Sequence, residues 1–406
     1  MANTIINPTW IGREVLRVAE NEVRFVRNVE KKLSDDFIVS GTKVGGTVGV
    51  RLPERFTTVK GQAIQQQNIV NQVVYVTITD QAQVAWGWSS SQATLDIQDA
   101  RERFVKPAAV QIANTMDKDG LGRLYQDVYF AQGTPGTTPT SNTTYFSAAD
   151  DLTQIAAVPK DSRNMVIDAV MGTAIANANL SLFNLGGSKN IFEDGRLAAN
   201  ALKWNEWWED VNITAHTYGT YAGTPLVNGA SQTGSTLNTD GWSSGASTLN
   251  KGDVFTIGSG STAVKAVNVQ SYADAGLAQK FVVTATTSDS SGAMATLPIS
   301  PAITVTGAYR TVVASPADNA TINVTGSTGV SSRQGLGFHR QAFCMASADL
   351  VMPNQGKAER VRAPKSGLSL RYWEASDIMT DQHPSRLDVI YGFKTLRADW
   401  AVRIQG

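Results

Sequence analysis

The distribution of charge along the chain constrains its organisation more than any other feature. The 406 residues contain 35 basic and 35 acidic side chains, and only nine of these 70 lie in the 116 residues between 217 and 332. Gly, Ser, Thr and Ala dominate that stretch, and turn residues separate short alternating runs such as Asp253–Ile257 and Phe281–Thr286. This pattern is typical of an all-β sandwich or barrel. We therefore expect residues 217–332 to form an inserted β-domain.

The flanking residues combine helical and strand periodicity, which predicts an α+β fold. Helical spacing of apolar residues predicts an amphipathic helix over residues 10–36 and a long helix, in two parts around Pro107, over residues 94–130. Alternation predicts strands over residues 44–58 and 69–79, which would form a hairpin around the polar tip Gly61–Asn68. After a mixed α/β segment over residues 145–215, further strands are predicted over residues 338–350, 368–373, 387–395 and 400–404, with a basic stretch over Lys357–Lys365.

The composition argues against several function classes. The formal net charge is zero, whereas a protein that coats DNA needs a basic excess. The single cysteine, Cys344, excludes a disulfide framework and a Cys-rich zinc module. No apolar window is long enough to predict a membrane span. We expect no signal peptide, because Met1–Trp10 lacks a basic start followed by an apolar run, and we expect no membrane partner.

Few residues could bind a metal or a phosphate or act as a nucleophile with a general base, and they are scattered along the chain. The three histidines, His216, His339 and His383, show no metal-ligand spacing. Cys344 follows His339 by five residues, which on one strand would place the two side chains on opposite faces. We interpret Cys344 as a small buried apolar residue. The Gly-rich segments Gly41–Gly49 and Gly258–Gly260 lack the order of a phosphate-binding loop and are interpreted as turns.

An acidic cluster beside tryptophans is the strongest candidate for catalysis. Glu206, Glu209 and Asp210 lie in the segment Trp204–Asp210, and a pair of carboxylates beside aromatic rings could serve glycoside hydrolysis. The alternative is a helix or loop with a Trp-rich buried side and a solvated acidic side, or a subunit contact. We favour this alternative. The sequence therefore predicts no catalytic, cofactor-binding or metal-binding residues, no cofactor, and a protein that is not an enzyme.

Three groups of segments occur in the order found in one known family. The first group is Leu95–Ala109, with the helix beyond it ending at Tyr125–Val128. The second group comprises Asn250–Ile257, Gln279–Ala285, Ile299–Ile303 and Ala314–Asp318. The third comprises Ala342–Ala346, Gly367–Leu370, Arg386–Gly392 and Ala401–Ile404. They resemble, respectively, the spine helix, the insertion domain and the closing strands of tailed-bacteriophage major capsid (coat) proteins, specifically the short-tailed enterobacterial phage coat family with an inserted domain.

The resemblance implies the Hong Kong 97-type capsid fold, which is α+β with a long spine helix, an extended β-hairpin loop and an inserted all-β domain. It divides the chain into an N-terminal arm (1–40), the extended loop (41–80), a peripheral domain with the spine helix (81–133), the first part of an axial domain (134–216), the inserted β-domain (217–332) and the closing strands of the axial and peripheral domains (333–406). It implies no catalytic residues.

The function implied by the resemblance is structural. The chain would self-assemble into an icosahedral shell that encloses the double-stranded DNA genome of a tailed phage. The implied partners are copies of the same chain in hexamers and pentamers, a scaffolding protein, a portal, packaged DNA bound without sequence specificity and, in some cases, a decoration protein. The implied location is the virion capsid, after assembly in the host bacterial cytoplasm.

Three other hypotheses stay open at this point. A surface adhesin or carbohydrate-binding protein would fit the β-domain and the Trp cluster, although the long helix and the expected absence of a signal peptide argue against it. A glycosidase would use Glu206 and Glu209. A cellular nanocompartment shell protein would share the capsid fold.

The predicted hairpin should be only marginally stable without a neighbouring subunit. A lone two-stranded hairpin is marginally stable in water, so we expect residues 41–80 to be loose until a neighbouring subunit covers them. Trypsin should then cut quickly after Arg55 and Lys60 in unassembled protein and slowly in shells.

Overall fold

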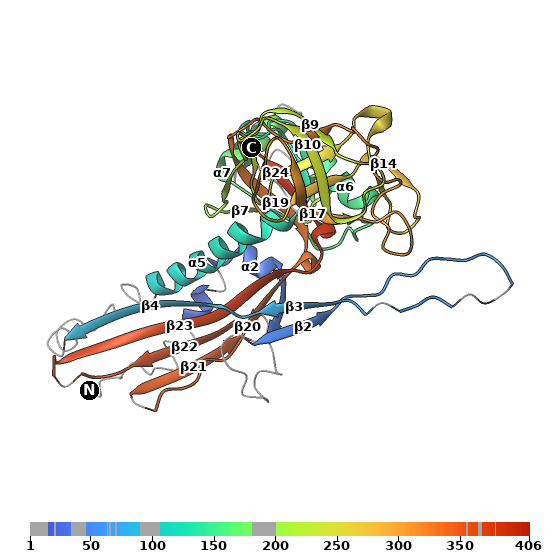
Figure 1. Cartoon of the computed structure of the whole chain (residues 1–406). Helices are drawn as coiled ribbons and strands as arrows, with labels where there is room; N and C mark the ends of the chain where they lie inside the picture. The colour runs from blue at the N-terminus through green and yellow to red at the C-terminus, as the bar shows by residue number, and fades with distance from the viewer. Residues whose placement is uncertain are drawn as a thin grey trace. The chain divides into compact units, whose positions relative to one another are not determined.

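The computed structural model describes residues 15–19, 22–33, 46–62, 64, 66–69, 71–89, 106–180, 200–354, 356–363, 368–377 and 379–406. They belong to two compact units (Figure 1). The first unit takes its residues from 1–51, 73–120 and 343–396, and the second from 52–72, 121–342 and 397–406. Both units combine segments that lie far apart in the sequence, so the chain passes between them several times.

The first unit is built on a six-stranded sheet. Its order is β1 (Glu30–Leu33), β20 (Phe343–Ser347), β23 (Gln382–Thr395), β22 (Leu368–Glu374) and β21 (Lys357–Ala363), while β4 (Asp80–Ser89) pairs with residues 382–391 of β23. The strand predicted over residues 368–373 is confirmed as β22, where Leu368, Leu370 and Tyr372 are buried. Residues 357–363 of the predicted basic stretch form β21, which pairs with β22 along its whole length, while residues 364–365 lie outside the described residues.

The predicted hairpin is confirmed with shorter arms. β2 (Thr47–Arg51) and β3 (Val73–Thr77) pair antiparallel, with Val50 opposite Val74. Residues 41–45, where the predicted loop begins, lie outside the described residues. The residues between the arms, 52–72, form a long loop that we call the 52–72 loop (Figure 1).

The long helix is confirmed over α5 (Lys106–Leu124), with Pro107 in its first turn. The prediction was wrong at its end, because a 3-10 turn, η3 (Tyr125–Asp127), follows Leu124. The predicted part over residues 94–105 lies outside the described residues. Tyr391 on β23 donates a hydrogen bond to Asp119 (2.7 Å), which holds the helix against the sheet of the first unit.

The single amphipathic helix predicted over residues 10–36 is wrong. Residues 15–19 are helical, but α2 (Phe25–Asn28) is a separate short helix and β1 then pairs parallel with β20. Asp117 of α5 accepts hydrogen bonds from the backbone N–H groups of Arg24 and Val26 (2.7 and 2.9 Å). These tertiary contacts satisfy backbone donors that a continuous helix would have used itself.

Gly120 explains how this N-terminal segment can approach the long helix. A Cβ at this position would lie 2.7 Å from the ring of Phe25, so the close packing of that ring requires glycine.

The second unit contains a sheet of short strands that is covered on both faces. Its order is β5 (Phe130–Gln132), β24 (Ala401–Gln405), β19 (Ser331–His339), β6 (Arg163–Ile167) and β7 (Glu206–Glu209), and β8 (Ala215–Thr217) pairs with the start of β19. Every residue of β6 and β24 is buried, as expected for strands with cover on both faces. The helix α6 (Asn142–Gln154) packs on β5 and β24, and α7 (Ala169–Leu180) follows β6.

The strand predicted over residues 338–350 is wrong as one element. β19 ends at His339, a 3-10 turn follows as η6 (Arg340–Ala342), and β20 begins at Phe343. β19 belongs to the second unit and β20 to the first. The break falls at Arg340 and Gln341, two exposed polar residues between two buried strands, and this interruption of the apolar run was the available sign of it.

The low-charge stretch forms a closed six-stranded barrel between β8 and β19 (Figure 1). The antiparallel order is β18 (Ile322–Val324), β12 (Val254–Ile257), β15 (Lys280–Val283), β17 (Met294–Ile303), β10 (Gly234–Trp242) and β9 (Gly223–Val227). A bridge between Leu226 and Thr321 joins β9 back to β18 and closes the barrel. Two small pairs complete it: β11 (Thr248–Leu249) with β16 (Thr287–Ser288), and β13 (Lys265–Val267) with β14 (Asp274–Ala278).

The two ends of this stretch lie side by side. Ser331 of β19 pairs with Thr217 of β8, so the chain leaves and re-enters the sheet at adjacent positions, as an insertion requires.

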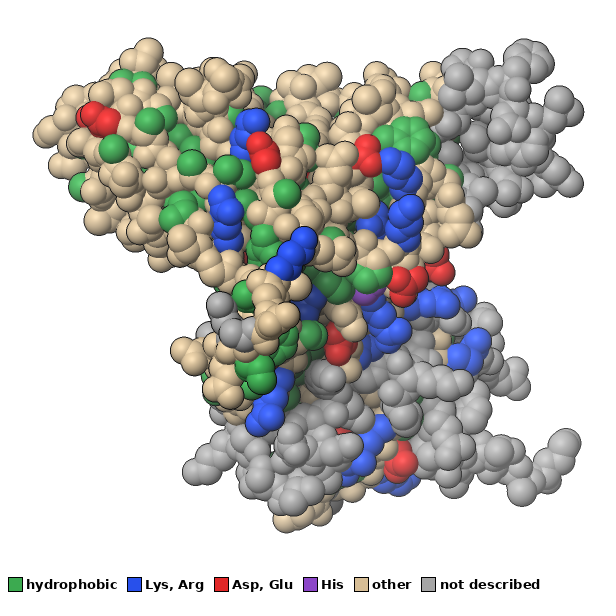
Figure 2. All heavy atoms as spheres, turned by 90° about the vertical axis from the view of Figure 1, so that its right-hand side faces the viewer, with side chains coloured by type: hydrophobic (Ala, Val, Ile, Leu, Met, Phe, Trp, Pro, Cys, Tyr) green, Lys and Arg blue, Asp and Glu red, His purple; other side chains and the backbone are tan. Residues whose placement is uncertain are grey.

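In the upper part of Figure 2 the surface is mostly uncharged, with single Lys, Arg, Asp and Glu side chains scattered over it.

The barrel has an interior of its own and also shares a core with its surroundings. The pair Phe255 and Phe281 lies in the barrel core, with ring centroids 5.8 Å apart. The neighbouring pair Val254 and Val282 points the other way and belongs to the core that includes Phe130. The alternation of the two strands therefore serves two cores at once.

We predict that the isolated fragment 217–332 folds, but with lower stability than within the chain. Its interior is closed, whereas Val254, Ala266 and Val282 would lose their outer cover. Circular dichroism of the fragment should show β structure and a cooperative melt. A random-coil spectrum would show that the barrel needs the rest of the second unit.

Candidate assembly surfaces and a buried polar junction

The acidic cluster does not form a carboxylate pair. Its segment is the strand β7, not the helix or loop expected, because Glu206 pairs with Asn164 of β6. On a strand, Glu206 and Glu209 point to opposite faces. Asp210 is buried, and its carboxylate accepts hydrogen bonds from the backbone N–H and the side-chain amide of Asn212 (2.8 and 2.9 Å). The two glutamates therefore cannot flank one glycosidic bond.

The histidines and the cysteine remain apart. Among the described residues, no group of three or more His, Cys, Asp and Glu side chains could hold a metal ion. His339 and Cys344 lie on different strands in different units, so the argument from odd spacing on one strand was wrong. Burial lowers the pKa of His339. His383 lies on β23, where its Nδ1 is 2.9 Å from the hydroxyl of Ser376.

The Gly-rich segments show no phosphate-binding geometry where they are described. Gly258 and Gly260 form the expected turn, with positive φ of 74° and 56°. Gly49 lies within β2 rather than in a turn, and residues 41–45 lie outside the described residues. Among the described helices, none is long and apolar enough to cross a membrane.

Cys344 is fully buried, as the sequence predicted, and its Sγ lies 3.7 Å from the carbonyl of Met345. If the chain assembles as the family resemblance implies, Cys344→Ala should leave that assembly intact, and it should destabilise the fold by only about 1 kcal/mol because a small buried side chain loses one heavy atom. Thiol titration should find the native Cys344 unreactive and the urea-unfolded one reactive. A loss of particles in the alanine variant, or under reducing agent alone, would contradict this interpretation.

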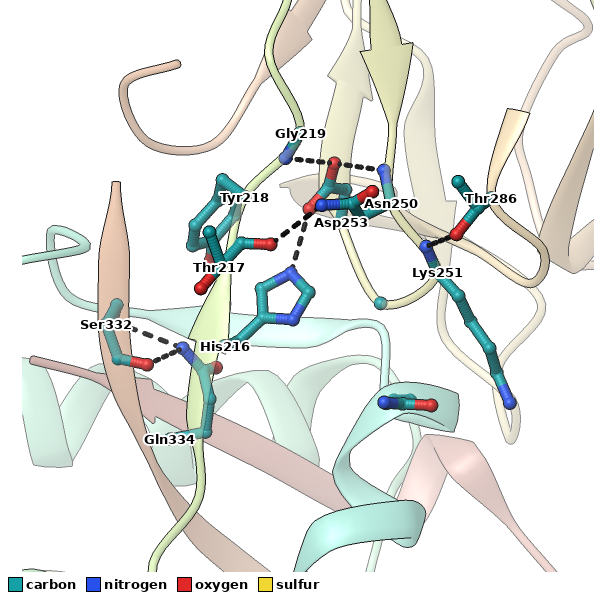
Figure 3. Close-up of polar contacts among 12 residues, drawn as sticks. His216, Thr217, Tyr218, Gly219, Asn250, Lys251, Asp253, Thr286, Ser332 and Gln334 are labelled. Atoms are coloured by element: carbon teal, nitrogen blue, oxygen red, sulfur yellow. Dashed lines mark hydrogen bonds and ion pairs between the residues drawn. The ribbon is translucent and has the colours of Figure 1, made fainter. Parts of the chain in front are cut away.

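A buried polar junction joins the start of the barrel to the sheet beneath it (Figure 3). His216 on β8 lies with its Nε2 2.8 Å from Oδ1 of Asp253, the residue before β12. Oδ2 of Asp253 accepts hydrogen bonds from the backbone N–H groups of Gly219 (3.0 Å) and Asn250 (2.8 Å). The side chains of His216 and Asp253 are 4% and 0% exposed. One carboxylate thus holds together three points of the chain.

A His–Asp pair also occurs in the catalytic sites of hydrolases, but the pair His216 and Asp253 is enclosed by other side chains of the protein. The other ring nitrogen of His216, Nδ1, lies 3.2 Å from the hydroxyl of Tyr125, so both nitrogens have protein partners. The ring of His216 packs edge-on against Tyr125 and Tyr218, with centroids 5.6 and 4.8 Å apart. A substrate would have to displace these contacts, so the pair is a structural link rather than a catalytic one.

The same junction contains a buried cation. Arg403 on β24 is fully buried, donates from Nη2 to the carbonyl of Gly252 (2.8 Å) and lies 5.8 Å above the ring of Tyr125. Burial lowers the pKa of Arg403 and raises that of Tyr218 to about 12, which keeps the phenol neutral. Sequence reasoning missed this junction. The available signal was Asp253, one of few charges in a nearly uncharged stretch.

The 52–72 loop carries the most concentrated exposed apolar surface among the described residues. Of the ten large hydrophobic side chains that are most exposed, four lie on it: Phe56 (57% exposed), Val59 (47%), Ile64 (92%) and Ile69 (72%). A segment this narrow cannot bury these side chains in a core of its own. Exposed apolar side chains grouped on one feature are typical of a surface that binds protein.

The two arms of the loop are joined beyond the strands by side chains. The last backbone bond of the ladder runs from Leu52 N–H to Gln72 C=O (2.9 Å). Further out, the amide of Gln67 accepts from the Thr57 N–H (2.9 Å) and donates to the Thr57 carbonyl. Gln67 therefore replaces a strand residue in bridging the arms.

Several solved structures are similar to this chain. One is from Mycobacterium phage Che8, with 13% identity and a TM-score of 0.46 over 94% of this chain and 90% of that chain. A second is from the mature capsid of bacteriophage PhiM1, with 9% identity and a TM-score of 0.46 over 94% and 86%. A third is a virus-like particle from Pyrococcus furiosus, with 5% identity and a TM-score of 0.44 over 97% of each chain. No protein-family model and no curated protein matches the sequence.

Proposed function

We propose that this chain is the major capsid protein of a tailed bacteriophage and that it forms an icosahedral shell around double-stranded DNA. The observation that carries the proposal is the 52–72 loop. Ile64 and Ile69 are exposed at the part of the chain least able to bury them. A second copy of the chain would supply that cover. The function is therefore assembly, and we propose no catalytic role.

The order of the elements supports the Hong Kong 97-type fold. A hairpin with a long loop precedes β4 and the helix α5, and a mixed α/β segment follows. After the barrel, the chain contributes β20–β23 to the first sheet and β24 to the second. We assign the first unit to the peripheral domain and the second to the axial domain with its insertion. This is the segment order implied by the family resemblance.

The zero net charge is compatible with a shell that a packaging motor fills. Such a shell contacts DNA without sequence specificity and needs no strongly basic lining. We propose hexamers and pentamers of this chain as the capsomers, with a scaffolding protein and a portal as assembly partners and a decoration protein as a further one. The proposed location is the virion capsid, after assembly in the bacterial cytoplasm.

Three observations argue against sugar chemistry. Trp204 is fully buried and Trp207 is 7% exposed, so neither ring offers a face on which a sugar could stack. Glu206 and Glu209 project from opposite faces of β7. The barrel interior is filled with apolar side chains.

Sedimentation of the recombinant chain tests the proposal against its alternatives. Expressed with the genes that neighbour its own, the chain should sediment as particles of megadalton mass, far faster than its 43.4 kDa monomer. Neighbouring portal and terminase genes would favour a phage over a cellular nanocompartment. A chain that stays monomeric in every combination, with or without binding to sugars, would overturn the proposal.

A further inference from the structure

The base of the 52–72 loop is held by its own chain. Tyr309 donates a hydrogen bond from its hydroxyl to Oε2 of Glu54 (3.1 Å), and its ring lies 5.9 Å from the guanidinium carbon of Arg55. Nη2 of Arg55 is 2.8 Å from Oδ2 of Asp399. The Arg55 and Asp399 side chains are 28% and 16% exposed, so solvent only partly reaches this ion pair.

A second tyrosine holds the next residue through the backbone. The hydroxyl of Tyr272 donates to the carbonyl of Phe56 (3.1 Å). Three consecutive residues of the loop, Glu54 to Phe56, are therefore bound by three side chains from distant parts of the second unit.

The side chains that hold the loop come mostly from the barrel. Tyr309 lies in the turn after β17, and Tyr272 lies in the turn between β13 and β14. That turn is itself well fixed, because the side-chain oxygen of Asn268 accepts from the backbone N–H groups of Gln270 and Ser271 (2.9 Å each). Asp399 lies in η7 (Ala398–Trp400), directly before β24.

Beyond Phe56, the 52–72 loop exposes large side chains to solvent, namely Val59, Lys60, Ile64 and Ile69. The side-chain bonds given above for the outer part join its own two arms, through Thr57 and Gln67. The base is thus anchored on the barrel side of the unit, while the tip presents apolar side chains to solvent.

We propose that the inserted barrel positions the 52–72 loop of its own subunit. Tyr309, Tyr272 and Asp399 fix the base of the loop, so that its tip is presented to the next copy in one direction. The proposal rests on the proposed function, in which the tip binds a second subunit. Fixing the base before assembly lowers the entropy that docking must remove, since each residue fixed costs about 1–2 kcal/mol of backbone entropy. The barrel would then act in assembly through the loop as well as through its own surface.

This anchoring revises the expectation that trypsin cuts quickly after both Arg55 and Lys60. In the unassembled chain, cleavage after Lys60 should be fast and cleavage after Arg55 slow, because the Arg55 side chain and the Phe56 carbonyl are both bound. The double variant Tyr272→Phe, Tyr309→Phe keeps both rings and removes both hydroxyl bonds. Each bond lost should raise the open population about fivefold, and the cleavage rate after Arg55 should rise about 25-fold.

Two variants serve as controls and extensions. Tyr75→Phe makes the same chemical change on β3, where the side chain is 62% exposed, and should leave both cleavage rates unchanged. Asp399→Asn weakens the ion pair and should accelerate cleavage after Arg55 alone. Hydrogen exchange of residues 54–57 should follow the same order, and circular dichroism should show that each variant is folded.

The outcomes separate this inference from the proposed function. Equal cleavage after Arg55 and Lys60 in the wild type, or an unchanged rate in the double variant, would overturn the positioning role even if shells form. Failure of the wild type to form particles would overturn the proposed function, while the cleavage experiment on single subunits would still decide whether the barrel holds the loop.

Discussion

Asp253→Ala should destabilise the second unit by about 3–5 kcal/mol, because it leaves several buried polar groups without their hydrogen-bond partner, at about 1–3 kcal/mol each. The substitution removes the acceptor of the Gly219 and Asn250 N–H groups and the partner of His216 Nε2. All three groups would stay buried without that acceptor, and each buried group left unsatisfied is costly. The midpoint of urea unfolding, followed by tryptophan fluorescence, should fall sharply.

Two further variants make the Asp253 result specific. Asp253→Asn keeps the shape and one acceptor oxygen, so its loss of stability should be smaller than that of alanine. Asp274→Ala removes an exposed carboxylate from the same barrel, 3.1 Å from Lys265, and should change the midpoint little. If Asp253→Ala unfolds at the same urea concentration as Asp274→Ala, the junction does not stabilise the attachment of the barrel.

The double variant Ile64→Asp, Ile69→Asp should abolish particle formation while leaving the subunit folded. Both side chains are largely exposed in the single chain, so the change should not disturb its core. In an apolar contact between subunits, two buried carboxylates would cost at least ~3 kcal/mol, which lowers the contact's equilibrium constant more than a hundredfold. The loss is repeated at every subunit of a shell.

The matched control is Ile64→Val, Ile69→Val, which keeps the apolar surface and should still give particles. Light scattering against protein concentration would measure the threshold for assembly in each case. Normal particles from the aspartate variant would show that the tip of the loop is not part of a subunit contact, and the assembly surface would have to lie elsewhere.

Local patterns of sequence predicted the elements whose stability is largely local. Alternation located β2 and β3, and the low charge of residues 217–332 indicated the barrel, whose strands are short and separated by turns. The first-turn position of Pro107 placed the start of the described part of α5. In each case the periodicity of the residues and their burial in the fold agree.

The elements that failed are those decided by a distant partner. β1 exists because it pairs with β20, which lies more than 300 residues further along the chain. β7 is a strand because β6 offers it an edge, although its Trp and Glu residues fit a helix equally well. The local sequence pattern does not indicate which distant strand a segment will pair with.

The polar junction and the anchored loop base escaped prediction for a related reason. Tyr272, Tyr309 and Asp399 are ordinary surface residue types, and only the fold brings them to Glu54–Phe56. Asp253 was one of nine charges in a weakly charged stretch and stood out only by its rarity. A charged residue in a stretch with almost no other charges should be tested as a buried structural group.

Electron microscopy of the purified protein tests most directly whether this chain builds a closed shell. The chain, expressed with and without its neighbouring genes, should give closed particles of uniform diameter or the capsomers from which they form. A reconstruction of those particles should place Ile64 and Ile69 of each subunit against a neighbouring copy. Fields of separate monomers under all of these conditions would contradict the account.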